Sequence, residues 1–179
     1  GPGFPTYIIA EIGINHNGSE AEAYKCIDAA AEAKVNAVKF QKRHLASLYT
    51  EEVLNNPERF EQNFQYMIPL LKKVELPEQA YHRLKAYTED KGMDFLCTPF
   101  DLVSAQFLDS LQVSGFKVAS ADLTNTHLIE HLCTYGKPLI ISTGMSRWGE
   151  IEKTVSLVKQ RQVPFALLHC RSVYPVWPR

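Results

Sequence analysis

Two lysines lie inside short apolar segments that are predicted to be buried β-strands. Lys39 falls in the run Ala37–Phe40, and Lys117 falls in the run Phe116–Val118. Burying an ammonium group is costly unless the charge is paired or solvated. Because hydroxyl side chains follow nearby in the sequence, the two lysines indicate a pocket that binds a small dianion or trianion.

Further polar side chains stand where the predicted strands end. They are Glu11, Gln41, Thr98, Ser142 and His169. In a β/α barrel, catalytic side chains project from these carboxyl ends of the strands. A polar residue can also simply mark the end of a strand, and this plainer explanation is preferred for Thr98 or Ser142 taken singly. The loops 13–18 and 142–145 are rich in small residues, whose backbone amides can approach a ligand closely.

The elements that must position these side chains alternate between strand and helix. Six apolar runs are predicted to be strands: Tyr7–Ala10, Ala37–Phe40, Phe95–Cys97, Phe116–Val118, Leu139–Ile141 and Phe165–Leu168. Such alternation predicts a parallel sheet covered by helices, in an α/β fold. An open doubly wound sheet and a β/α barrel both fit, and the absence of a G-x-G-x-x-G sequence after the first strand disfavours dinucleotide binding. The segment 42–74 cannot be assigned.

Helix boundaries are marked by familiar residues. Ser19 and Glu22 match a capping box, Pro77 is predicted to open a helix at its first position, and Asp101 to begin the next one. Gly92 and Gly136 are predicted to end helices. In the helix that follows Asp101, the side chains of Val103, Phe107 and Leu111 are expected to face inward.

The composition limits the class of partner. The 179 residues are 45% hydrophobic and carry a net charge of −1, which argues against a nucleic-acid or anionic-membrane partner. No apolar run reaches the ~20 residues that cross a bilayer, and no secretory signal is visible. Four widely spaced cysteines are expected to be reduced and mostly buried, so we expect a cytoplasmic protein. Gly1–Gly3 is interpreted as a tag remnant.

One motif suggests a different chemistry. His127, Glu130 and His131 match the H-x-x-E-H pattern of inverted zinc proteases. The apolar stripe of the same predicted helix is already needed for packing on the sheet. A solvated histidine face is therefore the preferred interpretation, and no metal ligand is assigned in this chain.

Six stretches of sequence together resemble the sialic acid synthase family of phosphoenolpyruvate-condensing enzymes. They occur in the family's order and spacing: Ala10–Gly18, Ala37–Lys42, Phe95–Asp101, Phe116–Asn125, Lys137–Met145 and Leu168–Pro175. The resemblance implies a TIM-type (β/α) barrel, of which residues 1–179 would form six of the eight units. The remaining strands and the family's C-terminal antifreeze-like domain are expected to be absent from this chain.

The resemblance also implies a reaction and the residues that perform it. Phosphoenolpyruvate would condense with N-acetylmannosamine to give N-acetylneuraminate and phosphate. The implied catalytic residues are Glu11, Lys39 and Lys117, where the lysines neutralise the anion and Glu11 transfers a proton or positions a hydroxyl. A buried carboxylate that is paired with a pocket lysine is the alternative interpretation of Glu11. The implied substrate-binding residues are Gln41, Thr98, Ser120, Asp122, Ser142, Ser172 and Tyr174. Asp122 stands where many relatives have the longer glutamate.

The family's cofactor and assembly are further expectations. The family uses a divalent metal, manganese or magnesium, whose ligands would lie on the barrel strands that are missing from this chain, and it forms homodimers. Lys34 replaces the glycine that usually ends the first helix, at a cost of ~1 kcal/mol in a left-handed conformation.

Three alternatives remain open. The first is a synthase for legionaminate or a related nonulosonate, which accepts a bacillosamine-derived sugar. The second is a non-catalytic anion-binding or assembly module. The third is a Schiff-base aldolase that uses Lys39 or Lys117 as its nucleophile.

Overall fold

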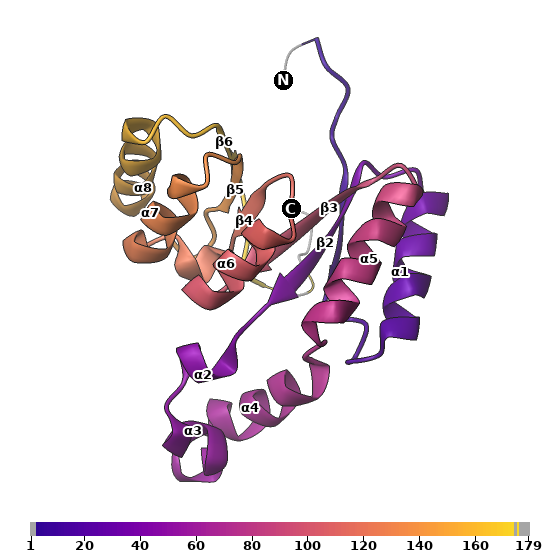
Figure 1. Cartoon of the computed structure of the whole chain (residues 1–179). Helices are drawn as coiled ribbons and strands as arrows, with labels where there is room; N and C mark the ends of the chain where they lie inside the picture. Colours follow the sequence, from indigo (N-terminus) through magenta and orange to yellow (C-terminus); the bar gives the residue numbers. More distant parts are fainter. Residues whose placement is uncertain (1–2, 174, 176–179) are drawn as a thin grey trace. The chain divides into compact units, whose positions relative to one another are not determined.

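The computed structural model describes residues 3–173 and Pro175. The chain divides into two compact units, Gly1–Cys97 and Thr98–Arg179. Within each unit, strands and helices alternate along the chain (Figure 1). In the first unit β1 and β2 pair in parallel, and in the second unit β4 pairs with β5 and β5 with β6, also in parallel. The predicted α/β class with parallel strands is confirmed.

The first unit contains two strands, most of a third and the helices between them. Its elements are β1 (Ile9–Gly13), α1 (Glu20–Glu32), β2 (Ala37–Lys42), α2 (Leu45–Leu48), α3 (Glu51–Asn55), the 3₁₀ helix η1 (Pro57–Arg59), α4 (Gln62–Val74), α5 (Glu78–Asp90) and the start of β3 (Asp94–Pro99). Figure 1 shows α2, α3 and α4 extending beyond the end of β2. This extension is the segment that could not be assigned from the sequence.

The second unit continues the alternation from the end of β3. Its elements are α6 (Leu102–Ser110), β4 (Phe116–Val118), the 3₁₀ helix η2 (Ser120–Asp122), α7 (Thr126–Thr134), β5 (Leu139–Ser142), α8 (Trp148–Gln160) and β6 (Phe165–Leu168). All six predicted strands are present, although β1 begins at Ile9 rather than at Tyr7. Tyr7 instead precedes the strand, and its hydroxyl donates a hydrogen bond to Asp94.

Apolar side chains from strands and helices form the core of each unit. In the first unit the rings of Phe40 and Phe95 stack with their centroids 5.3 Å apart, and Ile27 and Leu84 are fully buried. Burying a side chain of this size contributes about 1.5–3 kcal/mol. In the second unit Leu108, Ile129 and Ile141 are likewise fully buried.

One predicted helix face is partly wrong. Val103 is 41% exposed, whereas Ser104, Ala105 and Leu108 of α6 are buried. Asp101 caps the helix, and its carboxylate accepts hydrogen bonds from both the backbone nitrogen and the hydroxyl of Ser104. Because this cap buries Ser104, the inward face is turned away from Val103.

Most of the predicted helix ends are confirmed, with two adjustments. Gly92 and Gly136 have the positive φ expected of helix ends. Pro77 was predicted to be the first residue of a helix, but it is the N-cap of α5, which begins one residue later at Glu78. Ser19 accepts a hydrogen bond from the Glu22 nitrogen, as in a capping box, but the Ser19 nitrogen donates to the His16 carbonyl and Glu22 pairs with Lys25.

Lys34 has the left-handed backbone conformation that the sequence predicted, with φ of 56°. Its nitrogen donates to the Ala31 carbonyl, and the nitrogen of Val35 donates to the Ala30 carbonyl. These two bonds form a Schellman motif, which satisfies carbonyls at the end of α1. The motif thus holds Lys34 in a left-handed backbone conformation that a glycine would adopt without strain.

Candidate functional site

The first unit places Glu11 and Lys39 opposite each other on β1 and β2. The two residues are register partners, and Lys39 Nζ lies 2.6 Å from a carboxylate oxygen of Glu11. The Lys39 side chain is only 9% exposed, whereas that of Glu11 is 50% exposed. The charge of a buried lysine is therefore stabilised by a carboxylate that solvent can still reach.

Gly13 provides space beside this pair. It follows an irregularity in the β1/β2 register and has φ of 57°. A Cβ atom at this position would lie 2.9 Å from Glu11 Oε1 and 3.2 Å from Gln41 Nε2. The side chains of Glu11 and Gln41 therefore gather around a position that only glycine leaves open. Three of the predicted residues, Glu11, Lys39 and Gln41, are brought together in this unit.

The turn after β1 is held by His16, which the sequence analysis did not single out. His16 is almost completely buried, and its Nδ1 accepts a hydrogen bond from the Gly18 nitrogen at 3.1 Å. Burial lowers the pKa of the imidazole, and a hydrogen bond with the Gly13 backbone acts in the opposite direction. The burial of a polar side chain in a turn could not be recognised from its neighbours in sequence.

The second unit places Lys117, the middle residue of β4, beside Ser142, the last residue of β5. Lys117 is 7% and Ser142 is 6% exposed. The Lys117 ammonium donates hydrogen bonds to the hydroxyl of Ser142 and, at 2.7 Å, to the carbonyl of Val118. The Cys170 thiol donates to the same Ser142 hydroxyl at 3.2 Å. A buried cation is therefore surrounded in part by neutral dipoles.

Hydroxyl groups converge on Gly144 in the same unit. The Gly144 nitrogen donates to Ser120 Oγ at 3.1 Å. A Cβ atom on Gly144 would lie 2.6 Å from Ser172 Oγ, 2.9 Å from Ser120 Oγ and 3.3 Å from the Cys170 carbonyl oxygen. We call Gly144 with the hydroxyls of Ser120 and Ser172 the Gly144 cradle. Thr143 anchors it, because its nitrogen and hydroxyl both donate to the Leu168 carbonyl.

The other predicted residues have different surroundings. Thr98 is buried near the end of β3. Asp122 ends η2, and one of its carboxylate oxygens accepts a hydrogen bond from the Asn125 amide at 3.4 Å. His169 follows β6 and is exposed. Tyr174 lies outside the described residues, so its predicted role stays a prediction.

The H-x-x-E-H residues contact other side chains. His131 Nε2 lies 2.9 Å from the Tyr135 hydroxyl, and Glu130 forms an ion pair with Arg161 at 3.2 Å. His127 is exposed, as the preferred interpretation expected. Across residues 3–173 and Pro175, no group of three or more His, Cys, Asp or Glu side chains could hold a metal ion. These residues therefore do not fit the divalent metal that the resemblance implies.

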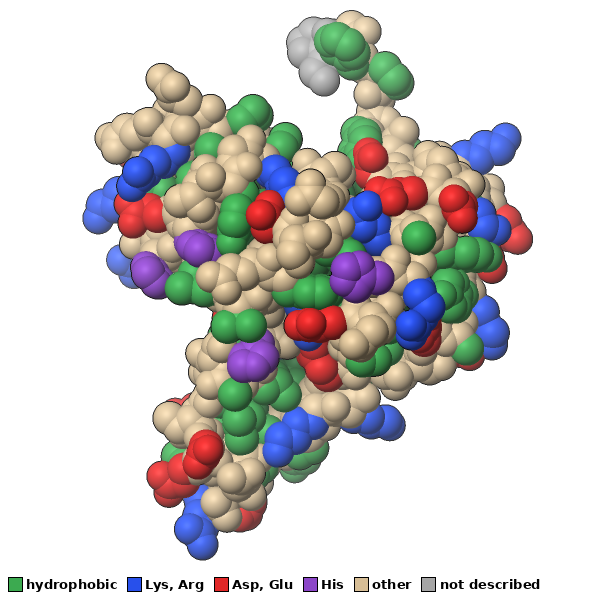
Figure 2. Space-filling view, viewed as in Figure 1, with side chains coloured by type: hydrophobic (Ala, Val, Ile, Leu, Met, Phe, Trp, Pro, Cys, Tyr) green, Lys and Arg blue, Asp and Glu red, His purple; other side chains and the backbone are tan. Residues whose placement is uncertain are grey.

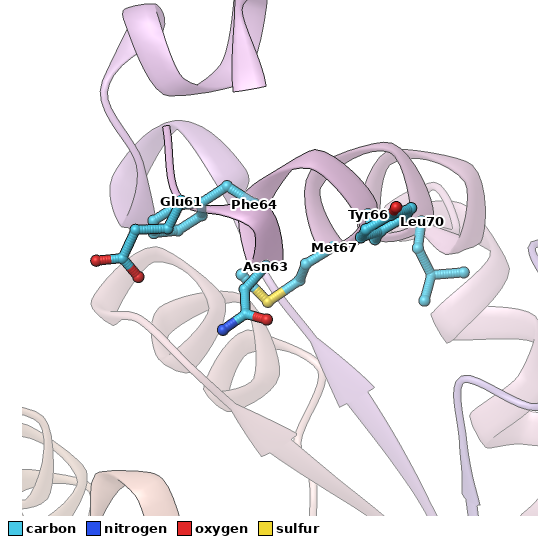
Figure 3. Close-up of a pocket in the computed structure, with 6 residues that line it drawn as sticks. All are labelled: Glu61, Asn63, Phe64, Tyr66, Met67 and Leu70. Atoms are coloured by element: carbon cyan, nitrogen blue, oxygen red, sulfur yellow. The ribbon is translucent and has the colours of Figure 1, made fainter. Parts of the chain in front are cut away.

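A separate hollow of about 520 Å³ lies on α4. Glu61, Asn63, Phe64, Tyr66, Met67 and Leu70 line it (Figure 3). None of the predicted site residues is among them. The hollow belongs to the helical extension of the first unit.

The surface carries both signs of charge. On the face drawn in Figure 2, acidic and basic side chains are interspersed. The four cysteines are free thiols, of which Cys97 and Cys133 are buried and Cys26 and Cys170 are partly exposed. Among the described residues, none of the helices has the length and apolar character that crossing a bilayer requires.

Comparison with known proteins gives consistent matches. Over 175 residues the chain is 33% identical to N,N'-diacetyllegionaminic acid synthase of Campylobacter jejuni (95% of this chain, 52% of that protein) and 32% identical to human N-acetylneuraminate-9-phosphate synthase (97% and 49%). Among solved structures, the N-acetylneuraminic acid synthetase of Leptospira borgpetersenii, in complex with citrate, matches with a TM-score of 0.84 and 38% identity, over 97% of this chain and 56% of that one.

The chain spans about half the length of the curated relatives it matches. The model of the NeuB family matches residues 26–179, which is most of the chain. The resemblance inferred from the six colinear stretches is thereby confirmed. The chain belongs to the NeuB family.

Proposed function

We propose that this chain supplies the phosphoenolpyruvate-binding part of a nonulosonate synthase. In the proposed reaction, C3 of phosphoenolpyruvate attacks the aldehyde carbon of an open-chain N-acylated amino sugar. Water adds at C2, and phosphate leaves by cleavage of its C–O bond. With N-acetylmannosamine the product is N-acetylneuraminate, and the legionaminic acid synthase among the relatives supports the alternative sugar.

The observation that carries this proposal is the group of hydrogen-bond donors in the second unit. The buried Lys117 ammonium touches the Ser142 hydroxyl, and Ser120 and Ser172 face Gly144. Cys170 joins the two groups, since its thiol touches Ser142 and its carbonyl faces Gly144. One fixed cation with several hydroxyls suits a phosphate or carboxylate, and such donors also stabilise charge that moves toward a leaving phosphate. The related Leptospira protein was crystallised with citrate, a small polyanion.

The residues of the first unit are proposed to have the roles that the family resemblance implies. Lys39 is assigned to the anion, and Gln41 is assigned to the sugar. Glu11 is assigned a proton transfer or the positioning of a sugar hydroxyl, for which its 50% exposed side chain is accessible. Thr98, Asp122 and Tyr174 keep the binding roles that the family resemblance implies.

The complete enzyme is proposed to be a cytoplasmic homodimer with a TIM-type barrel. A divalent metal, manganese or magnesium, would polarise the sugar aldehyde there. Because the described residues do not fit such a metal, we assign no step of its chemistry to this chain. The chain's own contribution is to bind and orient phosphoenolpyruvate.

Calorimetric titration of the chain with phosphoenolpyruvate and with inorganic phosphate tests the proposal. We expect phosphoenolpyruvate to bind at least about tenfold more tightly, because its carboxylate adds charge-assisted hydrogen bonds. Lys117→Met should weaken binding about 10- to 100-fold, since a hydrogen bond to a charged group contributes ~1.5–3 kcal/mol. Lys153→Met, in an exposed position of α8, is the matched control and should bind normally.

Two outcomes would favour the alternatives. Phosphoenolpyruvate binding no tighter than phosphate binding would indicate a non-catalytic anion-binding module. Borohydride trapping of pyruvate on Lys39 or Lys117 would indicate a Schiff-base aldolase, because the proposed condensation forms no covalent adduct with the protein. Phosphate release with each candidate sugar, measured with the full-length protein, distinguishes the two synthase activities.

A further inference from the structure

We infer that Cys170 is a positioning residue, which directs the hydroxyl proton of Ser142 toward the bound anion. The inference rests on the proposed function, because it concerns the same anion site. It adds a residue to which the family resemblance assigned no role. Cys170 follows β6, is partly exposed and forms no disulfide.

The contacts of Ser142 give the inference its geometry. Its Oγ receives hydrogen bonds from two donors, the Lys117 ammonium and the Cys170 thiol, the latter at 3.2 Å. An ammonium group has protons but no lone pair, so in the first contact Ser142 can only be the acceptor. The 6% exposure of Ser142 leaves water little access to its hydroxyl.

The valence of a hydroxyl then limits what the proton of Ser142 can do. A serine hydroxyl has two acceptor lone pairs and one proton. When Lys117 and Cys170 occupy both lone pairs, the proton must point to a third partner. In the proposed site that partner is an oxygen of the bound anion. The thiol thereby makes Ser142 a donor before the ligand arrives, which reduces the entropy that is lost on binding.

Without the thiol, the proton of Ser142 has more orientations. The lone pair that Cys170 occupied would become available, and the hydroxyl could rotate while it still accepted the hydrogen bond from Lys117. The Cys170 backbone would still face Gly144, because its carbonyl oxygen lies 3.3 Å from the position of a Gly144 Cβ. Removing the sulfur therefore removes the hydrogen-bond donor to Ser142. It does not remove the contact between the Cys170 carbonyl and the Gly144 cradle.

A double-mutant cycle measured by calorimetric titration with phosphoenolpyruvate tests the inference. Cys170→Ala is expected to weaken binding about threefold to fivefold, the effect of one modest hydrogen bond. Cys170→Ser, which keeps a donor at the same position, should bind within about twofold of the unmodified protein. In a Ser142→Ala background, Cys170→Ala should have no further effect, because the hydroxyl through which it acts is missing.

Controls and contrary outcomes keep the test decisive. Cys26→Ala on α1 makes the same chemical change in the first unit and should bind normally. Normal binding by Cys170→Ala, equal losses with alanine and serine, or the same loss in the Ser142→Ala background would each overturn the inference while leaving the proposed function intact. Absence of phosphoenolpyruvate binding by the unmodified protein would overturn the proposed function, and this inference with it.

Discussion

Glu11 and Lys39 face each other across β1 and β2, and their side chains form an ion pair 2.6 Å long. The family resemblance implies that the lysine neutralises an anion and that the glutamate transfers a proton or positions a hydroxyl. The structure shows that each is also the ion-pair partner of the other. An anion that bound Lys39, as proposed above, would share the lysine with a carboxylate that repels it.

Glu11→Gln is accordingly expected to strengthen the binding of phosphoenolpyruvate. Removing one negative charge beside Lys39 should lower the dissociation constant about threefold to tenfold at low ionic strength. Glutamine keeps the size and a hydrogen-bond acceptor. The measurement is a calorimetric titration with the ligand at low salt and again at high salt, where screening should reduce the gain.

The control for this change is Glu22→Gln. Glu22 pairs with Lys25 on the exposed surface of α1, and removing its charge should leave binding unchanged. A Glu11→Gln protein that binds more weakly than the unmodified chain would show that the carboxylate supports the anion site instead of opposing it.

Gly144→Ala is expected to weaken phosphoenolpyruvate binding at least about tenfold with little loss of folding stability. Its Cβ would lie 2.6 Å from Ser172 Oγ and 2.9 Å from Ser120 Oγ, so one or both hydroxyls must move out of the Gly144 cradle. Ser172 is exposed and can move at small cost. Titration reports the binding, and urea unfolding reports the stability.

The matched control is Gly149→Ala in α8, where an added Cβ would meet nothing within 4 Å. Alanine is favoured over glycine in a helix, so this variant should bind normally and unfold at slightly higher urea concentration. Equal binding by the Gly144 and Gly149 variants would show that the Gly144 cradle does not contact the ligand.

Sequence reasoning found the elements whose local signals agree with their packing. The strands β4 and β6 have the predicted bounds. Burial accounts for β4, all of whose residues are buried, but not for β6, in which Leu167 is 44% exposed. The segment 42–74 could not be assigned because α2 has four residues and α3 has five, too few to show a helical period. In α4, Pro69 interrupts the pattern, although Ile68, Leu71 and Val74 form its buried stripe.

In the candidate site, too, some features could be predicted from the sequence and others could not. Lys39 and Lys117 were recognisable because a charge inside an apolar strand needs a partner, and both are buried as expected. The partner itself depends on contacts between segments distant in sequence. The thiol of Cys170 reaches Ser142 from 28 residues away, and a cysteine alone gave no signal for that contact. The sequence therefore predicted the burial of the two lysines, whereas the contact between Cys170 and Ser142 is known from the structure alone.

Gly18→Ala is expected to destabilise the first unit by about 3 kcal/mol or more, because an overpacked site and a strained backbone add their costs. A Cβ atom at Gly18 would lie 2.2 Å from the carbonyl oxygen of Lys73, and the residue has φ of 80°. Gly92→Ala is the control, since Gly92 has a similar φ of 77° but nothing within 4 Å.

The comparison of the two glycine variants separates conformation from close contact. The Gly92 variant should lose only about 1 kcal/mol, the cost of a left-handed alanine. Urea unfolding followed by circular dichroism gives both values. Equal losses for the two variants would show that the contact between Gly18 and Lys73 contributes nothing measurable to stability.

His16 is expected to make the folded chain less stable as the pH falls below the ordinary imidazole range. Burial lowers its pKa in the folded state from 6.5, so the unfolded chain binds the proton more readily. Stability from this group is therefore fully present above the unfolded pKa and decreases as the pH falls toward the lower, folded value. The free energy of unfolding, measured in urea from about pH 7.5 to about pH 5.5, should show this decrease.

In His16→Asn, which keeps an acceptor for the Gly18 nitrogen, the decrease should be smaller. The exposed His127→Asn variant should retain the full pH dependence of the unmodified chain, and a His16→Asn protein that does the same would rule out His16 as its source.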